Sequence, residues 1–219
     1  MKRPALMKKG AEANLYVADW HGRKVVLKRR LPKMYRPKIL DEKIRFYRTI
    51  HEPQLMHEAK KAGVPTPIIF LVDLKNTTII MEYIEGKQVK QLLNEVSKRQ
   101  RESLCFQIGE LIGRLHEYGI VHGDLTTSNL IQTSGGKIFF IDFGLSDKTK
   151  ELEARGVDLH LMKRALQSIH YRFADECFDS AINGYSTVVN PRTSEKVLQK
   201  IKEIEKRGRY VAERKERDD

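Results

Sequence analysis

Residues 121–131, VHGDLTTSNLI, constrain the fold and chemistry of this chain more than any other stretch. They hold a histidine, an aspartate and an asparagine in one short polar loop between two apolar runs, and IDFGL follows at residues 141–145. The carboxylate of Asp124 can orient a hydroxyl or water nucleophile, and the oxygens of Asn129 and Asp142 are ligands of the kind that Mg²⁺ prefers. Each residue alone is also typical of a turn, so it is their combination that predicts a phosphate and metal site.

The composition favours a globular protein in a reducing compartment. Hydrophobic residues make up 40% of the chain, and no apolar run approaches the roughly 18 residues that a membrane span requires. The opening, MKRPALMKKGAEA, lacks the apolar core of a secretory signal. The two cysteines, Cys105 and Cys177, form no CxxC pair and so indicate neither a disulfide framework nor a thiolate zinc site. We therefore expect a cytoplasmic protein with no membrane contact.

The first part of the chain has the pattern of a small sheet with one main helix. Residues 14–30 and 63–86 each read as two strands around a turn. Between them Leu40, Ile44 and Tyr47 have helical spacing, which continues as far as Pro53. Proline removes an amide hydrogen from a helix, so a break or a new helix start is expected near it.

After Gly86 the pattern becomes mostly helical. One buried helix ends near Gly119, and its apolar stripe consists of Leu104, Ile108, Leu111, Ile112 and Leu115. Two short strands flank the turn TSGG, and helices follow from about Val157. The linker falls near YIEGKQ, which predicts an α+β chain with a strand-rich part, 1–85, and a helical part, 86–219.

In this order, GVPTP, HGDLTTSNLI, IDFGLS and VDL resemble a known family, the small atypical kinase subunit of the KEOPS complex. This Bud-type, RIO-related family of serine/threonine kinases acts in threonylcarbamoyladenosine (t6A) modification of tRNA. The resemblance covers essentially the whole chain and is strongest in HGDLTTSN, since ordinary kinases have Arg before the Asp and Lys two positions after it. It implies a reduced, two-lobed protein-kinase-like fold, with an N-lobe at 1–85 and a C-lobe at 86–219 that ends in a basic tail.

The resemblance also implies cofactors and partners. The cofactors are ATP and Mg²⁺. The implied partners are tRNA and other KEOPS subunits, above all the threonylcarbamoyl-transferring ATPase subunit and a small regulatory subunit on the N-lobe.

Carried onto the matching positions, the kinase pattern implies specific roles. Asp124 would be the catalytic aspartate, with Asn129 and Asp142 holding magnesium. Lys28, in VVLKRR, would contact the α- and β-phosphates, although a surface lysine in a basic run would look the same.

The carboxylate partner of Lys28 and the nucleotide pocket follow from the same resemblance. Glu52 is the predicted partner of Lys28, with Glu58 as the alternative because Pro53 directly follows Glu52. Adenine would lie against the main chain of Glu82 and Ile84, with Met81 at the back of the pocket. The loop over the phosphates would consist of Lys9, Gly10, Ala11, Glu12 and Ala13.

The sequence departs from ordinary protein kinases in two places. Only 16 residues separate Asp142 from Asp158, and no Ala-Pro-Glu follows, which leaves little room for a peptide-docking surface. Thr126 replaces the lysine that would neutralise the transferring phosphate, and one such contact can change a rate by roughly 10² to 10³. We therefore expect slow ATP hydrolysis or autophosphorylation inside a complex. Asp158 is either a buried aspartate that braces the catalytic loop or a helix cap.

The net charge of +12 is concentrated near the amino terminus. Residues 1–48 contain 15 basic and four acidic residues, and such a surface attracts polyanions, most commonly nucleic acid. The alternatives are a solubilising surface and, in the tail, an exposed helix with paired charges. The candidate tRNA contacts are Arg29, Arg30, Lys33, Arg207, Arg209, Arg214 and Lys215.

Two other functions compete with a KEOPS kinase. The motifs HGD and IDFG also occur in small-molecule phosphotransferases of the aminoglycoside or choline kinase type, which generally have a larger helical substrate subdomain. A pseudokinase-like scaffold that binds tRNA through its basic lobe is the alternative without catalysis.

Overall fold

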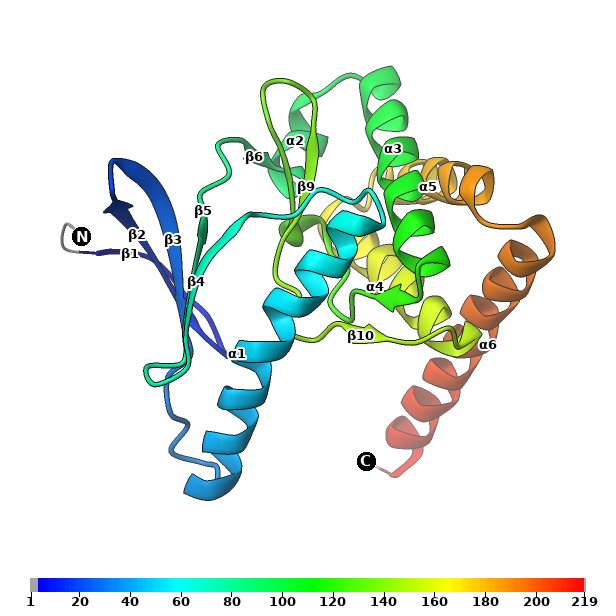
Figure 1. Cartoon of the computed structure of the whole chain (residues 1–219). Helices are drawn as coiled ribbons and strands as arrows, with labels where there is room; N and C mark the ends of the chain where they lie inside the picture. Colours follow the sequence, from blue (N-terminus) through cyan, green and yellow to red (C-terminus); the bar gives the residue numbers. More distant parts are fainter. Residues whose placement is uncertain (1–3, 219) are drawn as a thin grey trace.

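The expected two-lobed α+β architecture is confirmed by a computed structural model, which describes the backbone of residues 4–218 and the side chains of residues 4–207. A strand-rich lobe with one long helix lies beside a lobe built mainly from helices (Figure 1). Within residues 4–218, no helix combines the length and apolar character that crossing a bilayer requires.

The first lobe is a five-stranded antiparallel sheet in the order β1-β2-β3-β5-β4. A tight turn at His21 and Gly22 joins the second and third strands, and both residues have positive φ, as a two-residue hairpin requires. One sheet face packs Val25, Leu27 and Ile80 into a small apolar cluster, while Ile79 and Met81 join the main core. The strands are β1 (Ala5–Lys9), β2 (Asn14–Trp20), β3 (Arg23–Arg29), β4 (Ile69–Asp73) and β5 (Thr78–Glu82).

The helix α1 (Lys38–Lys61) continues through Pro53 without interruption. The prediction of a break near this proline was therefore wrong. Its buried face begins at Asp41 and continues through Glu52 to Ala59, on both sides of Pro53. Burial on both sides of the proline offsets the lost main-chain hydrogen bond. The predicted stripe is helical but faces outward, since Leu40 is 50% and Tyr47 59% exposed.

The second lobe is a helical bundle built around α3 (Lys98–Glu117) and α5 (Ala174–Val188). A capping box of Ser97 and Gln100 starts α3. These two helices approach so closely that a Cβ on Gly109 would lie 1.8 Å from the carbonyl oxygen of Ala181. The remaining helices are α2 (Val89–Glu95), α4 (Leu152–Ile169) and α6 (Pro191–Asp218).

Short strands carry the predicted motifs to the boundary between the lobes. The HGD loop follows β7 (Ile120–Val121), and a 3₁₀ turn at Thr127–Asn129 leads into β8 (Leu130–Gln132). The strand β8 pairs with β6 (Lys87–Gln88) and with β9 (Ile138–Phe140), which ends just before Asp142. After IDFGL, β10 (Asp147–Lys148) pairs with β7, so both loops are tied to one framework.

Candidate active site

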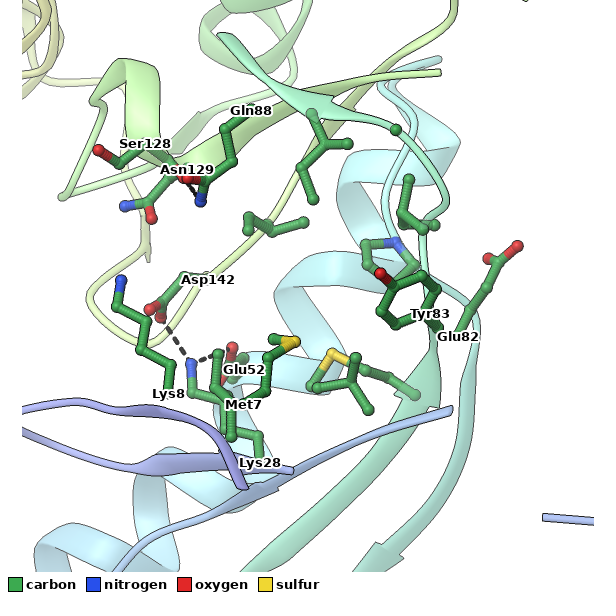
Figure 2. A pocket seen from close by; sticks show the side chains of 18 of the residues that line it. Met7, Lys8, Lys28, Glu52, Glu82, Tyr83, Gln88, Ser128, Asn129 and Asp142 are labelled. Atoms are coloured by element: carbon green, nitrogen blue, oxygen red, sulfur yellow. Dashed lines mark hydrogen bonds and ion pairs between the residues drawn. The ribbon is translucent and has the colours of Figure 1, made fainter. Parts of the chain in front are cut away.

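A cleft between the two lobes collects the predicted nucleotide-site residues. Its more apolar part has a volume of about 400 Å³, and an adjoining polar part has about 480 Å³. Lys28, Asn129 and Asp142 line both parts, as Figure 2 shows for the first. Met81, Glu82 and Ile84 line the apolar part, whereas the loop 9–13 and Asp124 line the polar part.

Lys28 lies at the centre of a buried ionic cluster. Its Nζ is 2.7 Å from Oε1 of Glu52 and 2.6 Å from Oδ1 of Asp142, and Figure 2 marks both contacts. Burial opposes the charge of Lys28, but the two carboxylates outweigh that effect and hold its pKa above the ordinary value. Burial likewise opposes the charge of Asp142, and Lys28 reverses the effect, so the pKa of this carboxyl is lowered. Both shifts favour the charged forms, so at neutral pH Lys28 is an ammonium and Asp142 a carboxylate.

The structure pairs Lys28 with Glu52 and not with Glu58. Glu52 is 1% exposed, whereas Glu58 lies six residues further along α1 and pairs with Lys61 and Lys148 near the surface. These two lysines lower the pKa of Glu58 to about 2. Pro53 does not disturb the position of Glu52, because the helix is continuous there.

Arg30, one of the predicted tRNA contacts, is buried at the edge of the cleft. The residue is only 3% exposed, and its guanidinium pairs with Oε2 of Glu52. It also lies 3.5 Å from the hydroxyl of Thr49 and lines the polar part of the cleft. The backbone ends β3 just before Arg30, and the side chain points inward to share a carboxylate with Lys28, so no outer surface presents it to RNA.

The catalytic-loop candidates contact each other directly. The side-chain amide of Asn129 donates to the main-chain oxygen of Asp124 at 2.9 Å and to its Oδ2 at 2.8 Å. This pair of donations orients the carboxylate and leaves the Asn129 Oδ1 as an acceptor, which points toward Asp142 in Figure 2. The loop can therefore present one oriented carboxylate and one amide oxygen to the cleft.

Asp158 braces this loop from within α4 and is not a helix cap. It is 1% exposed, and it accepts hydrogen bonds from the main-chain N–H groups of His122 at 2.5 Å and Gly123 at 2.8 Å. Burial raises the pKa of Asp158, but the hydrogen bond and charge of His116 and the donors of the loop lower it overall. Gly123 has a φ of 76°, and an added Cβ would lie 2.1 Å from the carbonyl oxygen of Leu145, so only glycine fits there.

The loop over the polar part of the cleft is anchored to the first lobe by Glu12. Its carboxylate accepts from Arg36 at 3.1 Å and from Arg48 of α1 at 2.7 Å. Burial of Glu12 favours its neutral form, but these two arginines prevail and lower its pKa. Part of the basic excess near the amino terminus is therefore neutralised internally.

The other predicted tRNA contacts have different surroundings. Arg29 is exposed at the end of β3, and Lys33 is half-buried beside Asp41. Arg207 is exposed on α6 and pairs with Glu153, as expected of a helix with paired charges. The side chains of Arg209, Arg214 and Lys215 lie outside the described residues.

Sequence reasoning missed several residues of the site. Alternation along β3 places Lys28 on the cleft face, but nothing in the charged run KRR indicated that Arg30 also points inward. His122 is part of the HGD motif, but only the structure shows what it contacts. Its Nε2 lies 3.1 Å from the main-chain oxygen of Ile141, next to Asp142. Met7 and Lys8 of β1 also line the cleft, and no local pattern indicates this.

Comparison with known proteins relates the chain to kinases. The family model described as "Protein kinase domain" matches residues 10–188. The crystal structure of the Rio2 kinase from Chaetomium thermophilum has a similar fold, with a TM-score of 0.58 at 17% identity, covering 94% of this chain and 72% of that chain.

Two relatives are more similar in sequence. The "KEOPS complex subunit Bud32" of Pyrococcus abyssi is 46% identical over 211 residues, which are 94% of this chain and 96% of that protein. A "Probable bifunctional tRNA threonylcarbamoyladenosine biosynthesis protein" of Methanothermobacter thermautotrophicus is 44% identical over 208 residues, or 95% of this chain but only 37% of that protein. Since the kinase model and a Bud32 relative each match most of its length, the chain belongs to the protein kinase family and, within it, to the Bud32 family.

Proposed function

We propose that the chain is an Mg²⁺- and ATP-dependent atypical serine/threonine kinase and ATPase that acts within the KEOPS complex in t6A biosynthesis of tRNA. One observation carries this proposal: Lys28, Asp142 and the linked pair of Asp124 and Asn129 all line one cleft. These residues supply a cation for phosphates, oxygen ligands for a metal and a carboxylate for an acceptor.

The donor set suits Mg²⁺. Among the described residues no three His, Cys, Asp or Glu side chains gather into a metal cage, and Mg²⁺ usually takes one or two protein oxygens together with substrate phosphates. Asn129 uses its amide N–H group on Asp124, so its oxygen is available beside that of Asp142. In this proposal these two residues hold the ion, which neutralises phosphate charge when bound.

The remaining residues of the cleft position the reactants. Lys28, held by Glu52, contacts the α- and β-phosphates, and the loop 9–13 covers them. The main chain of Glu82 and Ile84 binds adenine in front of Met81. The Glu82 N–H already donates to Ile68 at 2.8 Å, so its carbonyl and the Ile84 N–H are the groups for the base. Asp124, oriented by Asn129, accepts the proton of a hydroxyl or water as it attacks the terminal phosphorus.

The short segment after Asp142 favours an activity inside a complex over the phosphorylation of free peptides. Thr149 donates to the main-chain oxygen of Gly119, and α4 begins at Leu152, so this segment is pinned to the catalytic framework. Autophosphorylation and ATP hydrolysis need no peptide-docking platform.

The lobe boundary that we propose, between residues 85 and 86, lies in the connection between β5 and β6.

Partners follow from the relatives. Because the chain matches only 37% of a bifunctional protein named for t6A biosynthesis, we propose that it works with the remaining activity as a separate subunit, the threonylcarbamoyl-transferring ATPase. A small regulatory subunit would bind the N-lobe, where the edge strand β4 exposes Leu71 and Val72.

Both cysteines are free thiols, which supports a cytoplasmic location.

Binding of tRNA is the part of the proposal that rests on charge. Arg29, Lys33 and the α6 residues Arg207, Arg209, Arg214 and Lys215 are the proposed contacts. If they bind phosphates, tRNA affinity falls steeply between low and physiological salt in a filter-binding assay. A flat salt response would assign these charges to solubility.

An ATPase assay tests the enzymatic function. ATP consumption is measured for the wild type, for Asp142→Ala and for the matched control Asp147→Ala, an exposed aspartate five residues further on. The assay is run with and without tRNA and the partner ATPase. We expect Asp142→Ala alone to abolish consumption. Equal rates for all three proteins would favour a scaffold, and stoichiometric phosphorylation of amines or sugars would favour a small-molecule phosphotransferase.

A further inference from the structure

The catalytic loop lacks a cation beside the transferring phosphate. Thr126 stands two positions after Asp124, where ordinary protein kinases have lysine, and it lines the polar part of the cleft. Phosphoryl transfer depends mainly on positioning and on stabilising the charge of the phosphate oxygens. Another element can supply this charge if it brings a cation to the same part of the cleft.

A bulge in β1 brings Lys8 there. Leu6 pairs with Tyr16, but Lys8 pairs with Leu15, so Met7 is an extra residue on the first strand. In a regular ladder Lys8 would share the sheet face of Tyr16, which packs against the small apolar cluster of Val25, Leu27 and Ile80. The bulge instead turns Lys8 to the cleft face, and bulges beside active sites often redirect a side chain in this way.

The register across the sheet places Lys8 in one row with Lys28. Leu15 of β2 is opposite Lys8 on one side and opposite Lys28 of β3 on the other. Since neighbouring strands are about 4.8 Å apart, the two lysines start roughly 10 Å from each other and flank the polar part of the cleft. Lys8 lines both parts of the cleft, as Lys28 does.

The two lysines differ in their partners. Lys28 is buried and tied to Glu52 and Asp142. Lys8 is exposed and forms no ion pair within the part of the chain that the structure describes. Figure 2 shows its side chain extending from β1 toward Asp142 and Asn129. An unpaired ammonium beside the proposed metal ligands can bind an anion without first breaking another contact.

We propose that Lys8 binds the terminal phosphate of ATP and supplies the charge that ordinary protein kinases take from the lysine replaced by Thr126. This inference rests on the proposed ATP-dependent function. Lys8 forms no covalent bond and transfers no proton: the bond between the terminal phosphorus and the bridging oxygen breaks, ADP leaves, and the acceptor oxygen takes the phosphoryl group. A contact with the terminal phosphate alone distinguishes ATP from ADP.

Calorimetric titration with ATP and with ADP tests the proposal. Lys8→Met removes the ammonium and keeps an aliphatic side chain, Lys8→Gln is a second neutral variant, and Lys8→Arg keeps the charge. The control, Lys75→Met, removes an exposed charge from the turn between β4 and β5. Both neutral variants should weaken ATP binding at least about tenfold, as for loss of a charge-assisted hydrogen bond. ADP binding should change less than about twofold, while Lys8→Arg and Lys75→Met should resemble the wild type.

The outcomes separate this inference from the function on which it rests. Unchanged ATP binding in the neutral variants, or equal losses for ATP and ADP, would overturn the role of Lys8. Failure of the wild type to bind either nucleotide would overturn the ATP-dependent function instead. Turnover adds a second readout, since the neutral variants should also consume ATP about tenfold more slowly or worse at saturating nucleotide.

Discussion

Replacing Glu52 with glutamine removes the negative charge that Lys28 and Arg30 share. The two cations contact opposite oxygens of this carboxylate, and the side chains of both are at least 93% buried. After the exchange only Asp142, whose side chain is 49% exposed, still faces Lys28. Two buried cations then remain with one half-exposed carboxylate, and the cluster carries an uncompensated positive charge.

The expected loss follows from the burial of the cluster. Removing one partner of a buried ion pair costs about 3–5 kcal/mol, because the remaining charge stays desolvated. In a chain of this length each kcal/mol shifts the melting temperature by about 2–4 °C, so the variant should melt roughly 6–20 °C lower. The pKa of Lys28 is raised, so its stabilising charge is fully present below 10.5 and is lost only as the pH rises through the raised value. At neutral pH Lys28 of the wild type is therefore fully charged.

The assay is urea unfolding at pH 7, followed by circular dichroism, with Glu58→Gln as the matched control. Glu58 is on the same helix and also pairs with two cations, Lys61 and Lys148, but near the surface. Surface pairs contribute little because water replaces the lost contact. The control should therefore stay close to the wild type.

Equal losses for Glu52→Gln and Glu58→Gln would refute this reasoning, as would a loss below about 1 kcal/mol for Glu52→Gln. Either result would mean that water reaches the cluster and screens its charges. A double-mutant cycle with Arg30→Met identifies the source of the loss. If Glu52 stabilises the fold through Arg30, the coupling free energy should lie between about 0.5 and 3 kcal/mol.

Two further predictions concern the loop that carries Asp124, the proposed catalytic residue. Asp158→Asn should lower the free energy of unfolding by about 2–3 kcal/mol at pH 7, because the carboxylate accepts from the main chain of His122 and its neighbour. The pKa of Asp158 is lowered in the folded protein, so its contribution is present above 3.8 and is lost as the pH falls through the lower folded value. Urea unfolding over a pH series should show the gap between wild type and variant closing in acid, and a constant gap would contradict the role. Gly123→Ala should cost about 1–3 kcal/mol and also slow ATP consumption, because φ is positive and Leu145 blocks the Cβ. The control Gly136→Ala has a φ of 80° with no atom within 4 Å, so it isolates backbone strain, and equal losses would refute the clash.

The contact within the HGD loop between Asp124 and Asn129 was readable from the sequence because it is local. Asp124 and Asn129 are five residues apart on one loop and hydrogen-bond to each other, so their order along the chain implies their contact. The hairpin at His21 and Gly22 and the helix that ends before Gly119 follow equally from short-range signals. Lys28 follows the apolar residues VVL of its strand, and it is buried in the structure.

Long-range contacts decided what local patterns left open. The pattern could not choose between Glu52 and Glu58, since the choice depends on a lysine 24 residues before Glu52. It predicted a break at Pro53 because proline weakens an isolated helix, whereas burial on both sides keeps this helix continuous. It also gave no sign that Arg30 points into the cleft, because the carboxylate that holds it there is 22 residues away.

The sequence alone determined the groups that the two motifs contribute, Asp124, Asn129 and Asp142, because motifs preserve the order and spacing of residues within a loop. Only the tertiary structure decided which groups meet across the cleft: Lys28 and Asp142 are 114 residues apart, and a one-residue bulge in β1 turns Lys8 toward them. The physical reason is that side-chain direction in a sheet depends on register with the neighbouring strand, and ion pairing depends on burial. Both are properties of the assembled fold.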